Sequence, residues 1–235
     1  MNPSKMEMER QARRETLLKL AAAGALGAGG ILGLVRDALS AGSLPATPGF
    51  RHIKGPVGVD ATRASIGLNI KPGQSVMTGI GGEAVYIVGP DAFVQREKTK
   101  VTFEESGGAQ FLRIVTGSLL SVIGKGRDNR PRNLQIVTPT ATIGIRGTGC
   151  YIEAEEARTY FCLCYGEAEV TPKGDPKLKE TIRTKHHDHP IYIHASGSQM
   201  MAPATVMNHT DDELIMLENA VGRWPPFYGQ GGNRY

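Results

Sequence analysis

The chain has 235 residues, of which 27 are Lys or Arg and 23 are Asp or Glu, so its formal net charge is +4. Without residues 1–41, which hold six Lys or Arg and four Asp or Glu, 21 basic and 19 acidic residues remain. Because basic and acidic residues nearly balance, the composition indicates no strongly basic surface of the kind that binds nucleic acid, and we expect no nucleic-acid partner. The 30 Gly and 14 Pro separate short apolar alternations, a composition typical of an all-β chain with many turns.

Residues 1–41 have the layout of an export signal. Arg13 and Arg14 precede an apolar run over residues 17–35 that only Lys19 interrupts, and a short polar stretch follows. A charged region, an apolar region and a polar region in this order are the parts of a signal peptide, and paired arginines are typical of the twin-arginine route. We therefore predict a twin-arginine-type signal peptide over residues 1–41, with Arg13 and Arg14 as its export signal, and a periplasmic location.

The alternative interpretation of this segment is a membrane anchor, since residues 20–35 carry no charge. These 16 residues include five Gly. They fall short of the ~20 predominantly apolar residues that a spanning helix needs. We expect no stable membrane span once the signal peptide has been removed.

Beyond residue 64, apolar residues recur at every second position, as in half-buried strands. Clusters of Gly, Pro and Asp that suit tight turns separate the runs. This spacing predicts an all-β fold built as a sandwich, a barrel or a short solenoid. The alternating positions include Ile66, Leu68 and Ile70, then Val85 and Ile87, then Leu112 and Ile114, then Ile143 and Ile145.

One segment is more specific than this general alternation. Residues 138–170 read TPTATIGIRGTGCYIEAEEARTYFCLCYGEAEV, with an alternating run, an Arg-Gly-Thr corner and a closing Gly-Glu-Ala-Glu-Val strand. Together with residues 73–78, 83–87 and 117–120, this order resembles the FecR-like periplasmic domain family over residues 57–171. The resemblance implies a twisted stack of short, mostly antiparallel strands, a FecR-type sandwich or short β-solenoid. It also implies a sensing and protein-binding module that brings no catalytic residues.

The corner formed by Arg146, Gly147 and Thr148 has two interpretations. Its glycine spacing could suggest a phosphate-binding loop, but such a loop opens a helix, whereas a strand-like segment follows here. We predict a structural corner in which the glycine permits a sharp turn and Arg146 binds a carboxylate or backbone carbonyls. No spacing typical of a nucleophile elbow or a metalloprotease helix is present in the sequence, so we expect no enzyme activity and no catalytic residues.

A C-terminal extension over residues 172–235 is expected to follow the β domain. Thr210 and Glu213 have the spacing of a capping box, which predicts one α-helix over about residues 211–221. Leu214, Leu217 and Val221 recur at helical spacing, so one face of this helix should pack on the β core. The Pro- and Gly-rich residues 224–235 are expected to form a strap whose aromatic side chains anchor it to its own domain.

The three cysteines and a histidine cluster are the remaining candidate site. In an oxidising compartment thiols form disulfides or bind a ligand. Because the chain has three cysteines, at most one internal disulfide can form, and one thiol is left buried, ligated or paired with another chain. Cys162 and Cys164 project to the same face of a strand, and a hairpin brings the strand of Cys150 alongside. The candidate metal ligands are Cys150, Cys162, Cys164, His186, His187 and His189, with His194 and His209 further along the chain.

Three interpretations of these residues stay open. The cysteines could be small buried fillers with one disulfide, they could share a metal or redox site with the histidines, or one could be a reactive thiol. The cofactor is accordingly unknown, with a metal ion as the candidate. The FecR-like pattern places Phe161 and Leu163 at inward positions, which implies that Cys162 points outward.

Together, these features predict an exported, non-catalytic binding or sensing module that acts as an adaptor, signalling or assembly protein of the cell envelope. We expect its partner to be another envelope protein. Only twelve residues precede Arg13, which argues against the direct sigma-factor control that full FecR regulators exert. The alternative is a small periplasmic metal-binding or redox protein that uses the Cys/His cluster.

Overall fold

The structure, a computed structural model, describes residues 47–126 and 132–229 together with residue 33. The predicted signal peptide, with Arg13 and Arg14, lies outside the described residues. Within the described ranges, no helix combines the length and the apolar character that a membrane crossing requires.

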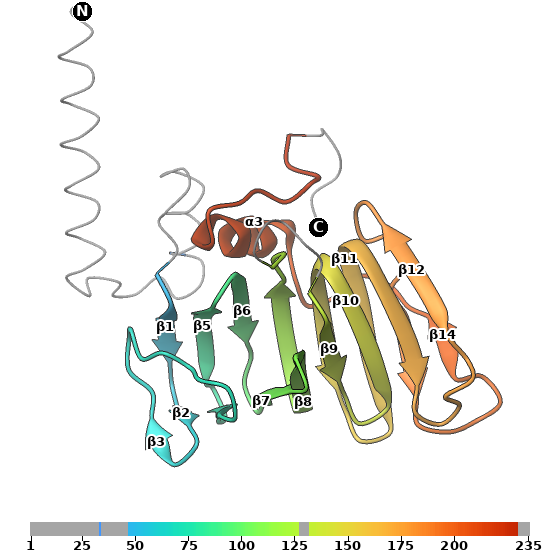
Figure 1. Cartoon of the computed structure of the whole chain (residues 1–235), viewed down its shortest axis with the longest axis horizontal. Coiled ribbons are helices and arrows are strands. Elements are labelled where there is room, and N and C mark those ends of the chain that lie inside the picture. Colours follow the sequence, from blue (N-terminus) through green and yellow to red (C-terminus); the bar gives the residue numbers. More distant parts are fainter. Residues whose placement is uncertain (1–32, 34–46, 127–131, 230–235) are drawn as a thin grey trace, which may run out of the picture.

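The described chain forms one 14-stranded sheet with a C-terminal helix packed on it (Figure 1). The prediction of an all-β fold with one C-terminal α-helix is therefore confirmed for the described residues. The elements are β1 (Gly49–Lys54), β2 (Val57–Val59), β3 (Thr62–Arg63), β4 (Ser75–Thr78), β5 (Glu83–Val88), β6 (Asp91–Gln95), β7 (Lys100–Ser106), β8 (Ala109–Val122), β9 (Leu134–Val137), β10 (Ala141–Ala154), β11 (Arg158–Pro172), β12 (Glu180–Thr184), β13 (Ile191–His194), β14 (Met201–Pro203) and α3 (Asp211–Ala220).

The strands follow the order β14-β13-β11-β10-β9-β8-β7-β4-β2-β3, and β1, β5 and β6 form a branch that joins at β8. The pairings are antiparallel except for that of β8 with β9, which is parallel. β12, β13 and β14 follow residue 171, yet β12 and β13 pair directly with β11. The sheet therefore continues without interruption from residues 57–171 into the segment that was predicted as a C-terminal extension.

The long strands change partners along their length. β8 pairs with β7 through its first part and with β6 through its second part, and β10 changes from β9 to β8 in the same way. Where β10 and β11 bend, Gly147 and Gly166 have φ angles of +64° and +100°. A Cβ atom on Gly166 would come within 2.7 Å of the Thr148 methyl group. Glycine is required at this bend because only glycine combines positive φ with so close an approach.

These bends fold the sheet over on itself, so that strands which do not pair face one another. Phe103 of β7 lies with its ring centroid 6.1 Å from Tyr86 of β5 and 5.6 Å from Phe93 of β6. Between these layers lies one cluster of buried apolar side chains, which we call the main core. Burial of apolar surface here is the dominant stabilising contribution to the fold.

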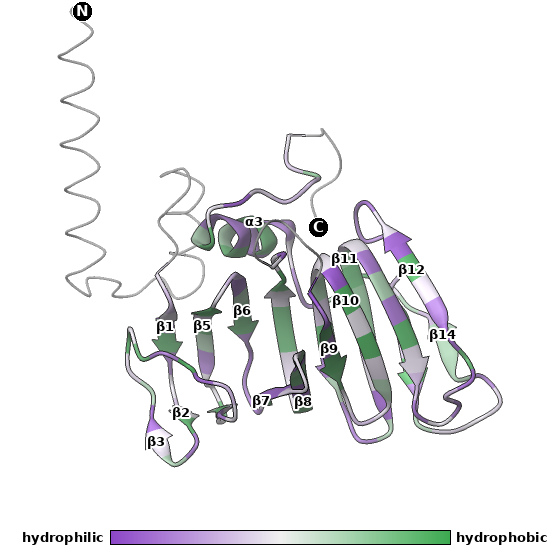
Figure 2. Cartoon of the chain, in the orientation of Figure 1, coloured by the Kyte–Doolittle hydropathy of each residue, from purple (hydrophilic) through white to green (hydrophobic). Residues whose placement is uncertain are grey.

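A second cluster, which we call the helix-side core, lies on the outer face of the sheet beneath α3. Leu214 and Leu217 of α3 are fully buried against Val94 and Leu120 of the sheet. Figure 2 shows hydrophobic and hydrophilic residues alternating along β11, and this strand contributes side chains to both cores. The two cores are therefore separated by the thickness of one sheet.

The helix begins at the predicted capping box. Thr210 accepts a hydrogen bond from the backbone N–H of Glu213, and the Glu213 carboxylate accepts one from the backbone N–H of Thr210, at 3.1 Å. Asp211 and Asp212 follow in the first turn, where the positive end of the helix dipole stabilises carboxylates. The first residue of the helix is consequently well determined, which also determines where the preceding His209 lies.

The predicted corner in β10 coincides with an irregularity in the strand. The register between β10 and β11 shifts between Arg146 and Gly149, and the side chain of Thr148 is fully buried. Arg146 is largely exposed, and its guanidinium lies 3.5 Å from a carboxylate oxygen of Glu167 on β11. An exposed ion pair of this kind contributes little to stability, so the shape of the corner depends chiefly on Gly147 and on the packing of Thr148.

Two glycines of β10 provide a matched test of this packing. A Cβ atom on Gly149 would lie 2.4 Å from the ring of Tyr165, whereas a Cβ atom on Gly144 would meet nothing closer than 3.9 Å. We expect Gly149→Ala to lower the free energy of unfolding by about 1–3 kcal/mol, because Tyr165 must move, and Gly144→Ala to change it by less than about 0.5 kcal/mol. Urea unfolding followed by circular dichroism measures both, and equal effects would contradict the packing described for Tyr165.

Candidate metal centre

The cysteines of β11 lie on the outer face of the sheet. Phe161 and Leu163 point into the main core, and Cys162 and Cys164 therefore point to the opposite side, into the helix-side core. This is the outward direction that the FecR-like pattern implies for Cys162. Both thiols are fully buried because α3 and Phe227 cover this face.

His187 reaches the cysteines from the loop that follows β12. Its backbone N–H donates a 3.0 Å hydrogen bond to the carbonyl of Cys164, and its φ angle is +53°. Asp188 holds the loop in shape, because its carboxylate accepts hydrogen bonds from the Thr184 hydroxyl at 2.6 Å and from the Lys185 N–H at 3.1 Å. The imidazole of His187 is fully buried as a result.

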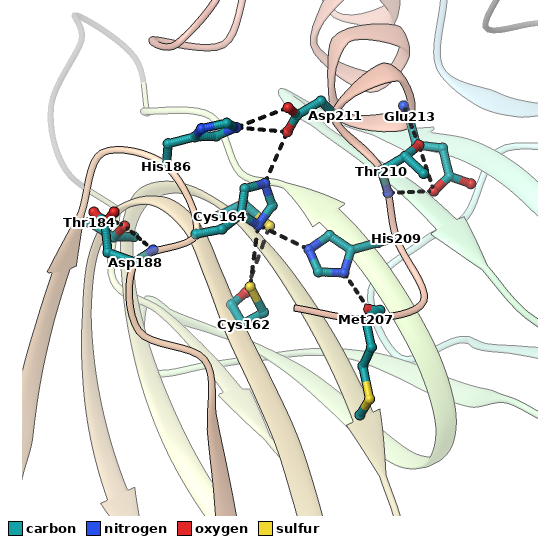
Figure 3. Close-up of polar contacts among 11 residues, drawn as sticks. Cys162, Cys164, Thr184, His186, Asp188, Met207, His209, Thr210, Asp211 and Glu213 are labelled. Atoms are coloured by element: carbon teal, nitrogen blue, oxygen red, sulfur yellow. Dashed lines mark hydrogen bonds and ion pairs between the residues drawn. The ribbon is translucent and has the colours of Figure 1, made fainter. Parts of the chain in front are cut away.

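His209 approaches from the other side, on the segment that leads into α3. Its Nδ1 lies 2.7 Å from the carbonyl oxygen of Met207, and its Nε2 lies 3.2 Å from Nδ1 of His187 (Figure 3). The ring stacks on Tyr151, with 4.7 Å between centroids. Contacts on the ring face and on Nδ1 thus orient Nε2 toward the cysteines.

Four potential ligand atoms converge in this arrangement: the sulfurs of Cys162 and Cys164, Nδ1 of His187 and Nε2 of His209 all lie within 4.8 Å of one another. A tetrahedral zinc ion with ordinary Zn–N and Zn–S lengths holds neighbouring nitrogens about 3.3 Å apart, and a nitrogen and a sulfur about 3.6 Å apart. The two histidine nitrogens are 3.2 Å apart, and the Cys162 sulfur is 3.4 Å from Nδ1 of His187. These two separations match those around one tetrahedral ion, and all four ligand atoms lie within 4.8 Å of one another.

The outer nitrogen of each histidine also has an acceptor. Nε2 of His187 donates to a carboxylate oxygen of Asp211 at 3.1 Å, and Nδ1 of His209 donates to the Met207 carbonyl. Hydrogen bonds of this kind fix the tautomer of a ligating histidine, so that the inner nitrogen presents a lone pair. Both inner nitrogens of this cluster are thereby prepared to bind a cation.

Asp211 connects the cluster to the molecular surface. Its two oxygens lie 2.9 and 3.0 Å from Nε2 of His186, whose side chain is 24% exposed (Figure 3). Burial by itself would raise the pKa of Asp211, but hydrogen bonds from His187 and His186 hold that pKa below its usual value. Asp211 is thus an anion that accepts from both imidazoles.

The thiols differ in their acidity. Hydrogen bonding from Cys164, with further hydrogen bonds from His187 and His209, lowers the pKa of Cys162 to about 3, whereas burial raises that of Cys164. Burial also acts to lower the pKa of His187, but Asp211 and Cys162 together raise it to about 9. The lowered pKa of Cys162 favours its thiolate, which is the form that binds a dication.

The structure brings together Cys162, Cys164 and His187 from the predicted ligand set. His186 contacts Asp211, which in turn contacts His187. Cys150 and His189 lie outside the cluster. Cys150 faces the main core, where its sulfur lies 3.2 Å from the Ser121 hydroxyl, because its place in β10 is opposite Leu163, which faces that core as well. His189 is exposed, because the loop after β12 turns only His187 inward.

His209 is the ligand that the sequence did not assign. It precedes the capping box directly, and the apolar face of the helix was predicted to pack on the sheet. These two signals together could have placed His209 over the outer face of β11. All three cysteines are free thiols in the described structure.

The three aromatic side chains that follow α3 lie in different surroundings. Phe227 packs against the ring of His186 at 4.5 Å and against Tyr165 at 5.9 Å. Trp224 and Tyr228 stack on each other at 4.1 Å and are 40% and 45% exposed. Phe227 alone of these three therefore packs against the site.

No protein-family model matches the chain, and no curated protein matches it, so the FecR-like resemblance stays a prediction. Two crystal structures of a candidate anti-sigma factor from Parabacteroides distasonis, at 1.65 and 2.50 Å resolution, match part of the chain. Their TM-scores are 0.46 and 0.45, and each is 11% identical over 56% of this chain and 59% of that chain. The chain thus spans less than two thirds of those structures, and the interpretation of the Cys/His cluster rests on its own geometry.

Proposed function

We propose that the protein binds one zinc ion through Cys162, Cys164, His187 and His209. The observation that carries this proposal is the convergence of four buried ligand atoms within 4.8 Å of one another, with an acceptor on the outer nitrogen of each histidine. Two thiolates and two imidazoles form a donor set that suits Zn²⁺. Two thiolates also balance the charge of a dication, which limits the cost of burying it.

The ion has a structural role in this proposal. Four protein ligands fill a tetrahedral shell and leave no position for a substrate or an activated water, which is the arrangement of structural zinc sites. The ligands come from β11, from the loop after β12 and from the segment before α3. The ion joins these three segments, so that it holds the C-terminal part of the chain on the outer face of the sheet.

The setting that we propose is the periplasm, where the protein acts as a non-catalytic binding or sensing module for another envelope protein. The paired arginines of the N-terminal segment and the FecR-like pattern of residues 57–171 support this setting. Buried free thiols would be unusual in an oxidising compartment. Metal ligation protects thiolates from pairing, and a twin-arginine substrate crosses the membrane folded, so the site can be filled before export.

The metal content of two cysteine variants tests the zinc site. We expect the wild-type protein to hold one zinc ion per chain and Cys162→Ser to lose it, because a hydroxyl is a far weaker ligand than a thiolate. Cys150→Ala is the matched control, since Cys150 is equally buried but lies on the opposite face, and it should keep the ion. Elemental analysis of protein folded with zinc measures this, and a wild type without stoichiometric metal would overturn the proposal.

The role of Asp211 generates a second prediction. We expect Asp211→Asn to weaken zinc binding about 10–100-fold, because the hydrogen-bond acceptor that orients His187 loses its charge. Asp212→Asn removes the same charge from the same helical turn and keeps the Asp211–His187 hydrogen bond, so it should bind zinc as the wild type does. Competition with a chelator of known affinity measures both constants, and equal losses would assign the effect to the helix dipole.

The location is tested at the paired arginines. We expect Arg13→Lys with Arg14→Lys to hold the protein in the cytoplasm with its signal peptide intact, because the twin-arginine route reads both guanidinium groups. Cell fractionation followed by immunoblotting measures this. Export of the double variant at the wild-type level would contradict the twin-arginine assignment and leave the zinc site unaffected.

A further inference from the structure

The four proposed ligands are buried. Cys162 and Cys164 are fully buried, as is the imidazole of His187, and His209 is 5% exposed. Cys162 and Cys164 belong to the sheet, which lies beneath the site. The segment of residues 204–228, which carries His209, α3 and Phe227, covers the site from the other side. We call this segment the C-terminal gate.

Polar contacts between side chains and backbone attach the gate to the sheet at several points. The gate residues that make these contacts range from Thr205 to Arg223, and their partners lie on β10, on β11, in the turn before β6 or at the end of β6. They are Tyr160 hydroxyl to Thr205 carbonyl at 2.9 Å, Asn208 amide to Glu153 at 2.7 Å, Arg96 to Glu213 at 2.6 Å, Tyr165 hydroxyl to Glu218, and Arg223 to the Pro90 carbonyl at 2.7 Å.

The gate can leave the sheet without disturbing the main core. Its apolar side chains, chiefly Leu214 and Leu217, pack only in the helix-side core, and the main core lies on the other side of the sheet. Proteins open locally where an element buries less apolar surface than the whole fold does, and such openings cost less free energy than global unfolding. Detachment of the gate would therefore expose the cysteines while the main core stays packed.

We propose that the C-terminal gate controls metal exchange: zinc enters and leaves only while residues 204–228 are detached from the sheet. The inference rests on the proposed zinc site. When the gate opens, the Zn–N bond to His209 breaks and a water molecule takes the open position on the ion. A competing ligand then replaces that water and the remaining protein ligands, with no change of oxidation state. A closed gate retains an ion that was bound during folding.

The rate of zinc transfer to a chromophoric chelator in excess, 4-(2-pyridylazo)resorcinol, tests this proposal. We expect the wild-type rate to be independent of chelator concentration, because gate opening precedes chelator attack. Phe227→Ala removes the side chain that covers His186, and Asn208→Gly removes the amide contact to Glu153 while keeping the backbone at φ +61°. Phe227→Ala should release zinc about tenfold faster, because it removes a partly buried ring contact, and Asn208→Gly should release it by a smaller factor, because its hydrogen bond is exposed.

Two control variants separate gate opening from other routes. Val101→Ala creates a cavity in the main core, at a fully buried position on β7, and lowers global stability without touching the gate. Ile80→Ala changes a side chain that is 77% exposed and lies outside the gate. Both should release zinc at the wild-type rate. An equal acceleration in Val101→Ala and Phe227→Ala would overturn the proposal in favour of global unfolding.

Two further outcomes would distinguish a failure of the gate proposal from a failure of the zinc-site proposal. A release rate that rises in proportion to chelator concentration and is equal in all variants would show direct access to the site and would overturn the gate, while the zinc site stands. A wild-type protein that binds no zinc would overturn the proposed function itself. Trp224 is the only tryptophan of the chain and lies on the gate, so its fluorescence should change with the same time course as zinc release.

Discussion

The alternation of side chains along β11 is the constraint on which the rest of the structure depends. Phe161 and Leu163 complete the main core, and the residues between and after them, Cys162 and Cys164, are thereby directed to the other face. A thiol pair on the outer face needs a cover, and α3 with its flanking segments supplies one. Because one layer of sheet separates the two cores, the candidate site on the outer face leaves the apolar main core continuous.

The start of α3 and the candidate metal centre are parts of one local structure. His209 supplies a candidate ligand, Thr210 caps the helix, and Asp211 accepts a hydrogen bond from the outer nitrogen of His187, so three consecutive residues contribute to the candidate site and to the start of the helix. The capping box determines the direction in which the chain enters the helix, and this direction determines where His209 points. Any change that shifts the first turn of α3 therefore shifts a ligand and its outer hydrogen bond at once.

The polar side chains of the candidate metal centre form a connected series of hydrogen bonds. Asp211 lies between His186 and His187, and His187 lies between Asp211 and the Cys162 thiol. In a buried environment such charges stabilise one another because water screens them little. The hydrogen bonds that orient His187 and His209 are therefore present before any ion enters, which reduces the reorganisation that metal binding requires.

The sequence by itself determined the local features of this protein. Period-two alternation and glycine turns identified the all-β class, and the spacing of Thr210 and Glu213 identified the helix nearly to the residue, because these signals arise from neighbours in the chain. The same alternation placed Cys162 and Cys164 on one face. It left open which histidines join them, because the partners lie 23 residues or more away along the chain.

Only the tertiary structure decided the ligand set. Cys150 shares a hairpin with Cys162, yet its register opposite Leu163 turns it to the main core. His186, His187 and His189 are close in sequence, and the positive φ of His187 brings just one of them inward. His209 joins the cysteines because α3 packs across the sheet. Register, loop conformation and packing between distant segments are set by contacts that no short stretch of sequence contains, and these three decided which side chains meet.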